Sequence, residues 1–511
     1  MTSRLSRTGL SEHKLAAPVI ALFSGALITL SLAPFELWPC AVLGLYRLLQ
    51  LLQTENYRRA AFLGWFFGMG MFGTGSSWVY VSIHVHGYAP VPLALILTLI
   101  WTSGLALLPM IFSYSYVRFT SPYRGAILFG FPALWVLFEW LRSWLLTGFP
   151  WLYVGYSSID TWLSGWAPVS GVYGLSWAIG VSASCLFLIT HHRNVQLRIS
   201  AIVIMLCLWL GGLALQKVQW TEPRGSDPVI TVAIVQGNIP QHLKWRPDYY
   251  ASTLDIYRQM TKNLNRVDLI IWPEAAIPNY YRRAQSFLRP IVKDLKNKNT
   301  TLITGIPYQN QLEEKKSQIH NSILALGNGS GTYHKQRLVP FGEYVPFEKL
   351  LRGLIEFFDL PMSNFSPGEP NQALLNAGTL KLAPYICYEI VYPDLVREFA
   401  QDADMLITIS NDSWFGDSIG PIQHLQMARM RALENGRFLI RSTNNGISAI
   451  IDSRGNIQNQ SEQFVAQNLS GKAVIMKGRT LFSRTGSLPI LIICTLLLAG
   501  VILNSKVSFK N

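Results

Sequence analysis

Residues 380–389 read LKLAPYICYE, an apolar segment that stops at a cysteine followed by Tyr-Glu. Apolar runs of this length, bounded by polar or turn residues, are typical of strands that are covered on both faces. Helical segments lie between several such runs, for example at 393–398 and 423–435. Strands that alternate with helices predict an α/β sandwich. The other predicted strands occupy about 229–235, 267–272, 300–305, 321–326, 332–338, 405–410, 438–441 and 448–452.

Long apolar runs surround this more polar region. Each is close to the ~20 residues that a helix needs to cross a bilayer. We therefore expect a transmembrane domain of seven helices over 1–216, an α/β domain over 217–483, and an eighth helix with a short tail over 484–511. The eight runs lie at about 15–32, 37–53, 61–83, 91–117, 125–142, 167–190, 199–216 and 484–504.

The composition agrees with a chain that combines membrane-spanning helices with a more polar domain. Only 14% of the 511 residues are charged, below the ~25% of an average soluble protein, and the mean hydropathy is +0.24. A net charge of +14 would also suit a nucleic-acid-binding protein. The basic residues are dispersed and flank apolar runs, so anionic lipid explains them better, and we expect no nucleic-acid partner. The first run could be a signal peptide, but no small-residue cleavage site follows it, which favours an uncleaved helix.

The basic residues also predict the orientation, because cytoplasmic loops carry an excess of Lys and Arg. The connections near 33–36, 84–90 and 143–165 contain neither residue. All the basic connections then fall on one side, so both termini are expected in the cytoplasm and 217–483 in the periplasm of a bacterium. The basic residues are Arg4, Arg7, Lys14, Arg58, Arg59, Arg118, Arg124, Arg193, Arg198, Lys506 and Lys510.

Three polar residues occupy special places in the predicted α/β domain. Glu274 ends a strand, Lys335 lies on the return strand of a hairpin, and Cys387 lies at a strand-to-helix junction. A thiol is mostly protonated at neutral pH, so a nucleophilic cysteine needs a nearby base or cation. Lys335 and a backbone N–H near Tyr388 would stabilise the charge that develops on an attacked carbonyl oxygen. Taken singly, each residue also has an ordinary structural interpretation: a capping acid, an edge lysine or a core cysteine.

The other four cysteines lie within or beside apolar runs and are interpreted as small buried hydrophobic residues. They are Cys40, Cys185, Cys207 and Cys494. We find no metal-ligand spacing and no glycine-rich phosphate loop, so no metal and no cofactor are expected.

Taken together, the motifs resemble the nitrilase (carbon–nitrogen hydrolase) superfamily over about 229–470. The resemblance lies in Trp-Pro-Glu at 272–274, Leu-Val-Pro-Phe-Gly-Glu at 338–343, Cys-Tyr-Glu at 387–389 and Ile-Ser-Asn-Asp-Ser-Trp-Phe at 409–415. It implies an αββα sandwich with a catalytic triad of Glu274, Lys335 and Cys387.

The whole chain is similar to the bacterial apolipoprotein N-acyltransferases, through the stretches 146–151, 236–241, 411–416, 427–432 and 441–446. This resemblance implies an inner-membrane enzyme that performs the last step of lipoprotein maturation. A phospholipid, typically phosphatidylethanolamine, would donate an acyl chain through a thioester on Cys387. The α-amine of the S-diacylglyceryl cysteine of an apolipoprotein would accept it. We expect a monomer.

The resemblance further implies a set of supporting or substrate-binding residues. Tyr388 lies beside the nucleophile, and Trp245 belongs to the substrate region. Glu343 and Glu389 would support the triad, although both could also be ordinary structural acids. Asn411 and Trp414 complete the set.

The insertion between Glu343 and Pro370 has two interpretations. Its apolar residues fall on one helical face, which could pack on the domain's own core or form a lipid-facing arm at about 344–369. That face comprises Leu350, Leu351, Leu354, Phe357 and Phe358.

Two other functions use the same features. A membrane-tethered nitrilase or amidase would let water resolve the thioester, and a lipid-binding scaffold protein would not need the thiol.

Overall fold

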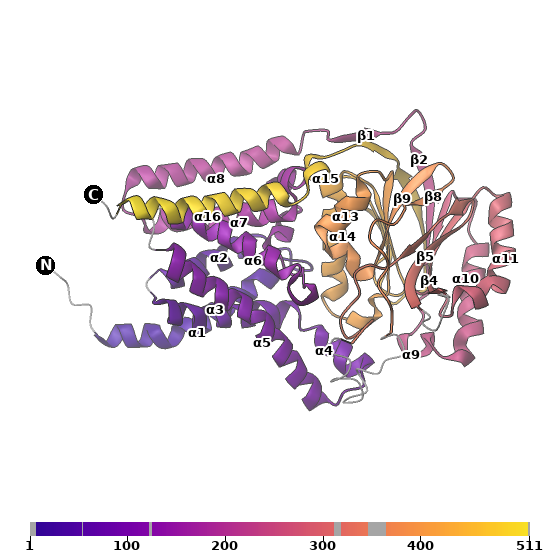
Figure 1. Ribbon diagram of the computed structural model, residues 1–511, viewed down its shortest axis with the longest axis horizontal. Helices are drawn as coiled ribbons and strands as arrows, with labels where there is room; N and C mark the ends of the chain where they lie inside the picture. The colour runs from indigo at the N-terminus through magenta and orange to yellow at the C-terminus, as the bar shows by residue number, and fades with distance from the viewer. Residues whose placement is uncertain (1–6, 54, 122–124, 311–317, 346–363, 509–511) are drawn as a thin grey trace. The chain divides into compact units, whose positions relative to one another are not determined.

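The computed structural model describes residues 7–53, 55–121, 125–310, 318–345 and 364–508. The chain forms two compact units (Figure 1). Unit 1 comprises Met1–Tyr80, Pro92–Val218 and Thr485–Asn511, and unit 2 comprises Val81–Val91 and Gln219–Arg484. The short segment Val81–Val91 therefore groups with the α/β unit, although it lies between helices of unit 1 in the sequence.

Unit 1 is helical, and every predicted apolar run contains a helix. Three stretches are long and apolar enough to cross a membrane: Val91–Thr120, Trp162–His191 and Val195–Leu215. Shorter apolar helices cover Ala16–Leu30, Pro39–Leu52 and Leu488–Leu503. The helices are α1 (Arg7–Leu30), α2 (Pro39–Leu52), α3 (Tyr57–Gly75), α5 (Val91–Ser115), α6 (Phe131–Arg142), α7 (Ala167–His191), α8 (Val195–Leu215) and α16 (Leu488–Ser508).

One predicted helix is shorter than its apolar run. The run at 61–83 begins within α3, but α3 ends at Gly75. Gly73, Gly75 and the following serines have poor helix propensity, so apolar composition alone does not continue the helix.

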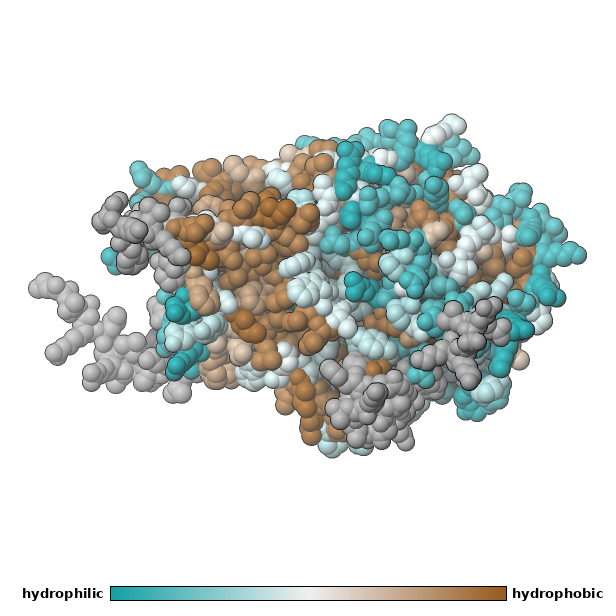
Figure 2. All heavy atoms as spheres, in the orientation of Figure 1, coloured by the Kyte–Doolittle hydropathy of each residue, from teal (hydrophilic) through white to brown (hydrophobic). Residues whose placement is uncertain are grey.

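The helices of unit 1 carry apolar side chains on their outer faces. In its most apolar window, α8 is only 11% buried, whereas the corresponding window of α7 is 83% buried. Figure 2 shows the resulting hydrophobic surface over these helices. A contiguous exposed apolar surface of this extent is typical of contact with lipid. Its exposed residues include Leu95, Leu99, Ile100, Val203, Leu206 and Leu210.

Close contact between α1 and α3 depends on two glycines. A Cβ atom on Gly25 would lie 1.9 Å from the Phe67 carbonyl oxygen, and one on Gly70 would lie 1.8 Å from that of Leu22. Small residues at such positions allow two helix backbones to approach closely, which is how helices in membranes gain packing energy.

The described part of unit 2 contains two large sheets with helices on both outer faces (Figure 1). The first sheet has the order β14-β2-β3-β4-β5-β7 and the second β13-β12-β11-β10-β9-β8-β6. The first comprises β2 (Val229–Gln236), β3 (Leu269–Ile271), β4 (Thr301–Asn310), β5 (Gln318–Gly327), β7 (Thr332–His334) and β14 (Gln467–Val474). The second comprises β6 (Gly329–Ser330), β8 (Leu375–Ala377), β9 (Leu380–Ile386), β10 (Met405–Ser410), β11 (Leu439–Thr443), β12 (Ala449–Ile451) and β13 (Ile457–Gln460). This arrangement confirms the predicted αββα sandwich.

The helices α10 (Tyr250–Lys262) and α11 (Tyr281–Asn297) cover the first sheet, and α13 (Pro393–Ala400) and α14 (Gly420–Asn435) cover the second (Figure 1). Strands β2, β3 and β4 are parallel, as are β9, β10 and β11. Each sheet therefore brings the carboxyl ends of adjacent strands to one edge, where sites gather in α/β folds.

A short antiparallel pair closes the main segment of unit 2. Strand β1 (Thr221–Pro223) pairs with β15 (Met476–Gly478), with Thr221 opposite Gly478. The α/β segment lies between α8 and α16 in the sequence. Its first and last strands therefore pair with each other, which holds the two ends of the segment together.

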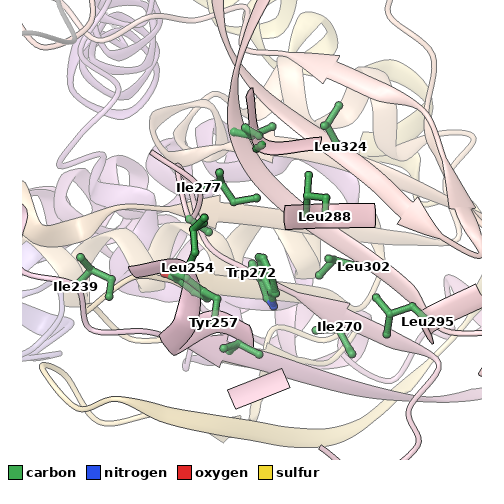
Figure 3. Packing of buried hydrophobic residues seen from close by; sticks show 14 residues of the cluster. Ile239, Leu254, Tyr257, Ile270, Trp272, Ile277, Leu288, Leu295, Leu302 and Leu324 are labelled. Atoms are coloured by element: carbon green, nitrogen blue, oxygen red, sulfur yellow. The ribbon is translucent and has the colours of Figure 1, made fainter. Parts of the chain in front are cut away.

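The core between the first sheet and its helices is built around Trp272 (Figure 3). The Trp272 ring lies 5.1 Å from that of Tyr257 on α10, and its Nε1 donates to Thr261 Oγ1 at 3.0 Å. Because Trp272 precedes Pro273 and Glu274 in the chain, this packing anchors the loop that carries the predicted catalytic acid.

We expect the substitution Leu288→Ala to destabilise unit 2. Leu288 lies on α11 in this core and is only 3% exposed. Removing its side chain should cost about 2–5 kcal/mol, because lost burial and the remaining cavity add. The midpoint of thermal unfolding of the full chain in detergent should fall measurably. Phe464→Ala, at a side chain that is 42% exposed, is the control and should leave it nearly unchanged; equal shifts would contradict the assigned core.

Candidate active site

The three predicted catalytic residues converge at the carboxyl ends of strands. Glu274 follows β3, Lys335 follows β7, and Cys387 begins the 3₁₀ helix η9 (Cys387–Val391) directly after β9. Lys335 was predicted within the strand; it lies one residue beyond β7, and its N–H still donates to the Asn321 carbonyl at 2.8 Å. The structure brings all three side chains close enough for their charges to interact.

The Lys335 ammonium is buried between two carboxylates. Its Nζ lies 2.8 Å from Glu343 Oε1 and 3.7 Å from Glu274 Oε1, and the residue is 1% exposed. Burial by itself lowers the pKa of Lys335, but the carboxylates of Glu343 and Glu274 raise it above the ordinary value of a lysine. Lys335 is therefore a permanent cation at any physiological pH.

The Glu274 carboxylate is fixed by two donors. Asn321 Nδ2 donates to its Oε1 at 2.7 Å, and the backbone N–H of Asn411 donates to its Oε2 at 2.8 Å. Burial raises the pKa of Glu274, and the positive charge of Lys335 only partly offsets this effect. A carboxylate with a raised pKa is a better general base than an ordinary one, and its geometry is set before any substrate arrives.

Asn321 is a site residue that the sequence did not reveal. The same Nδ2 group also donates to Glu343 Oε1 at 2.8 Å, so one amide orients both acids. Asn321 lies in β5 next to His320 and Ser322, and nothing in the sequence sets one of these polar residues apart from its neighbours.

Cys387 lies in a strained turn. Its φ is +51°, which is unusual for a non-glycine residue, and its side chain keeps partial exposure. Burial of the sulfur and the charge of Glu274 raise the pKa of the Cys387 thiol to about 12, against the opposing effect of Lys335. The resting thiol is therefore protonated, and it must give up its proton when a substrate reacts.

Glu389 connects the nucleophile turn to the segment that follows Lys335. It is fully buried and accepts hydrogen bonds from Tyr333 Oη at 2.9 Å, from the Gln336 N–H at 2.7 Å and from the Ile386 N–H at 2.8 Å. Burial raises the pKa of Glu389 to about 7, although these donors and Lys335 oppose the shift. Glu389 therefore ties the residue before Cys387 to the segment that follows Lys335.

The remaining predicted residues fall in two places. Asn411 contacts Glu274 as described, and Tyr388 follows the nucleophile, with its ring 5.3 Å from that of Tyr392. Trp245 directly follows the short helix α9 (Gln241–Lys244). Trp414 instead contacts the segment Val81–Val91: its carbonyl accepts from Ser82 Oγ at 2.8 Å, and its ring lies 5.4 Å from that of His86.

A second buried lysine lies beside the acid. Lys244 is 1% exposed, and its Nζ donates to the backbone carbonyl of Glu274 at 2.9 Å. Burial lowers the pKa of Lys244 to about 8, although the negative charge of Glu274 opposes the shift. Nothing in the sequence singles out Lys244, because a lysine in a short polar helix is usually a solvated residue.

Two other predictions from the sequence concern cysteines and the insertion. Cys185 and Cys494 are buried as predicted, whereas Cys40 is only half-buried. Cys207 is exposed on the apolar outer face of α8. Its interpretation as a buried residue was wrong, because an apolar helix in this unit turns hydrophobic side chains outward. Of the expected arm at about 344–369, residues 346–363 lie outside the described residues.

Residues 24–185 match the family described as apolipoprotein N-acyltransferase N-terminal domain, and residues 231–471 match the carbon-nitrogen hydrolase family. The apolipoprotein N-acyltransferase of Pseudomonas syringae pv. tomato is 43% identical over 96% of this chain and 97% of its own length. The chain belongs to the apolipoprotein N-acyltransferase family.

The same name is carried by a relative in Pseudomonas aeruginosa that is 44% identical over 93% of this chain and 92% of its own length. A crystal structure of a carbon-nitrogen hydrolase from Helicobacter pylori G27 covers 48% of this chain and 89% of its own, with 18% identity and a TM-score of 0.36. Membership in the family makes the chain an acyltransferase whose α/β unit has the nitrilase fold.

We expect Lys244→Met to change the pH dependence of acyl transfer. The substitution removes a positive charge beside Glu274, so the Glu274 carboxylate becomes harder to form and its pKa rises further. The acid limb of the pH–rate profile should move to higher pH, with the maximal rate less affected. Lys262→Met, at an exposed lysine on α10, should leave the profile unchanged. A Lys244→Met profile that overlies the unsubstituted one would show that Lys244 does not act on Glu274.

Proposed function

We propose that this enzyme transfers a fatty acyl chain from a phospholipid of the phosphatidylethanolamine type, through a thioester on Cys387, to the α-amine of the S-diacylglyceryl cysteine of an apolipoprotein. The observation that carries the proposal is the buried ammonium of Lys335, held between Glu274 and Glu343 and interacting with Cys387. It supplies a base, a nucleophile and a fixed positive charge in one place. Acyl transfer through a covalent intermediate needs these three elements.

In the first half-reaction Glu274 accepts the thiol proton as the Cys387 sulfur attacks the ester carbonyl. The negative charge that develops on the carbonyl oxygen is stabilised by the Lys335 ammonium and a backbone N–H near Tyr388. The C–O bond then breaks, and the proton held by Glu274 passes to the departing lysophospholipid oxygen. The acyl group remains on sulfur as a thioester.

In the second half-reaction the lipoprotein amine attacks the thioester carbonyl. Glu274 accepts a proton from the amine, the C–S bond breaks, and the proton returns to the Cys387 sulfur. The products are an amide and the free thiol. One site thus serves two lipid substrates in turn, which predicts ping-pong kinetics.

The apolar surface of unit 1 supports the proposal that the substrates are lipids. Moving an acyl chain into water costs ~0.8 kcal/mol per CH₂, so a site that stays at the bilayer avoids a large penalty. Trp245 supports a substrate contact beside α9: its Nε1 is buried and has no hydrogen-bond partner among the described residues. We assign the ester or headgroup oxygen of a substrate to this donor, and the segment at about 344–369 to a lipid-facing arm.

We further propose the membrane arrangement that the basic residues predict. The chain crosses the bacterial inner membrane eight times, seven times within 1–216 and once within 484–511, and both termini are cytoplasmic. Residues 217–483 form a periplasmic catalytic domain, and the enzyme acts as a monomer without a cofactor. The apolar helices of unit 1 and the alternation of basic connections support this arrangement.

The thioester is tested by incubating the purified enzyme with a phospholipid labelled in its acyl chain. A labelled adduct that hydroxylamine releases should form on Cys387, and a diacylglyceryl peptide should then take up the label. Cys387→Ala should abolish the adduct, whereas Cys207→Ala, at an exposed cysteine outside the site, should not.

The outcomes separate the alternatives. An adduct that appears only as free fatty acid would favour a hydrolase, in which water replaces the amine. No adduct on the unsubstituted enzyme would end the proposal and leave a lipid-binding role.

The orientation is tested with introduced cysteines and a membrane-impermeant maleimide on spheroplasts. Lys298→Cys, at a side chain 51% exposed in unit 2, should be labelled on intact spheroplasts. Arg58→Cys, at an exposed position in the first turn of α3, should be labelled only after permeabilisation. The reverse pattern would place the catalytic domain in the cytoplasm. Both variants carry Cys207→Ser to remove the exposed natural thiol.

A further inference from the structure

A buried polar cluster lies behind the nucleophile turn and takes no part in the proposed chemistry. It consists of Asp412, His424 on α14 and Arg441 on β11, each at most 2% exposed. Arg441 Nη2 donates to Asp412 Oδ2 at 2.5 Å and lies 3.1 Å from His424 Nδ1, and Asp412 Oδ1 accepts from Ser410 Oγ at 2.6 Å. Burying three interacting polar groups costs desolvation free energy, and apolar residues of similar volume are often at least as stabilising. Such a cluster is therefore a candidate for a role other than stability.

The cluster reaches the nucleophile through His424. The Nε2 atom of His424 lies 3.2 Å from the backbone carbonyl oxygen of Cys387. A carbonyl oxygen only accepts, so Nε2 carries the hydrogen. The Nδ1 atom lies 3.1 Å from Arg441 Nη2, which donates, and 3.3 Å from Asp412 Oδ1, which accepts. Burial and the positive charge of Arg441 lower the pKa of His424 against the opposing effect of Asp412, which favours the neutral ring. With its one hydrogen on Nε2, the neutral ring accepts from Arg441 at Nδ1, so Arg441 selects the Nε2–H tautomer.

This hydrogen bond acts on the strained residue itself. Cys387 has a φ of +51°, a conformation that is unfavourable for a non-glycine residue and persists only when the surroundings impose it. Rotation of the peptide that follows Cys387 would move both its carbonyl oxygen and the N–H of Tyr388, the predicted donor to the oxyanion. A fixed carbonyl oxygen therefore fixes the direction of that N–H.

The same cluster also touches the side chain of the nucleophile. Ser410, whose hydroxyl donates to Asp412, is hydrogen-bonded to the Cys387 thiol. The strand register places Ser410 beside Cys387. Ile409 on β10 pairs with Ile386 on β9, and Ser410 and Cys387 are the residues that directly follow this pair. The cluster thus holds Cys387 at its backbone and at its sulfur.

We propose that His424, held in its Nε2–H tautomer by Arg441 and Asp412, is a positioning residue that locks the Cys387 turn for attack. The inference rests on the proposed function, because it takes Cys387 as the nucleophile. A misplacement of about 1 Å in a reacting group can cost about 10²-fold in rate, so the lock affects the chemical step and not lipid binding.

The test compares His424→Leu with His424→Gln in single-turnover acylation of Cys387 by labelled phospholipid. The leucine variant cannot donate, and its acylation rate should fall about 10²-fold, with the lipid concentration at half-maximal rate changed less than about twofold. The glutamine variant offers a side-chain N–H at a similar reach, and its rate should recover at least tenfold relative to leucine. Leu288→Ala, a destabilised core variant remote from the cluster, should acylate at the unsubstituted rate.

The outcomes distinguish a failure of the proposed acyl transfer through Cys387 from a failure of the positioning role of His424. If the unsubstituted enzyme forms no adduct, the proposed function fails and not only this inference. If it forms the adduct, a His424→Leu rate within threefold of it, or a glutamine variant no faster than leucine, would overturn the positioning role. Equal loss in Leu288→Ala would assign the effect to stability, which also contradicts it.

Discussion

The buried ammonium of Lys335 is the interaction on which the rest of the site depends. A lysine that is 1% exposed is tolerated only because Glu343 and Glu274 lie at 2.8 and 3.7 Å. Asn321 donates to both of those carboxylates, and Lys244 donates to the backbone carbonyl of Glu274, so the site contains a set of interdependent buried polar groups. Removing one partner would leave another uncompensated, which costs more than the pair contributes. The two sheets provide the rigid frame that keeps these groups in register.

The turn at Cys387 is also held by buried polar groups. Glu389 holds the N–H of Ile386 before Cys387, and His424 holds the carbonyl of Cys387 itself. Two buried polar groups from different elements therefore fix the peptide on either side of the sulfur. Backbone strain of this kind persists only where such contacts impose it.

The two units of the chain place their apolar side chains in opposite ways. In unit 1 the apolar side chains face outward over α5 and α8, whereas in unit 2 they gather around Trp272 between sheet and helices. Both patterns follow from the hydrophobic effect, with lipid as the surrounding medium in the first and water in the second. A membrane-bound acyltransferase with a polar catalytic unit needs both on one chain.

Much of this could be predicted from the sequence, because strand type, apolar runs and the Glu, Lys and Cys at strand ends are local patterns. Strands β6, β8, β13 and β14 of the two large sheets were missed, since their residues are too few or too polar to form an apolar run. Asn321, Lys244 and His424 were missed as well, although each is decisive for a neighbour. Their roles depend on contacts with residues 30 to 47 positions away in the chain, and only the folded sheets bring those partners within hydrogen-bonding distance.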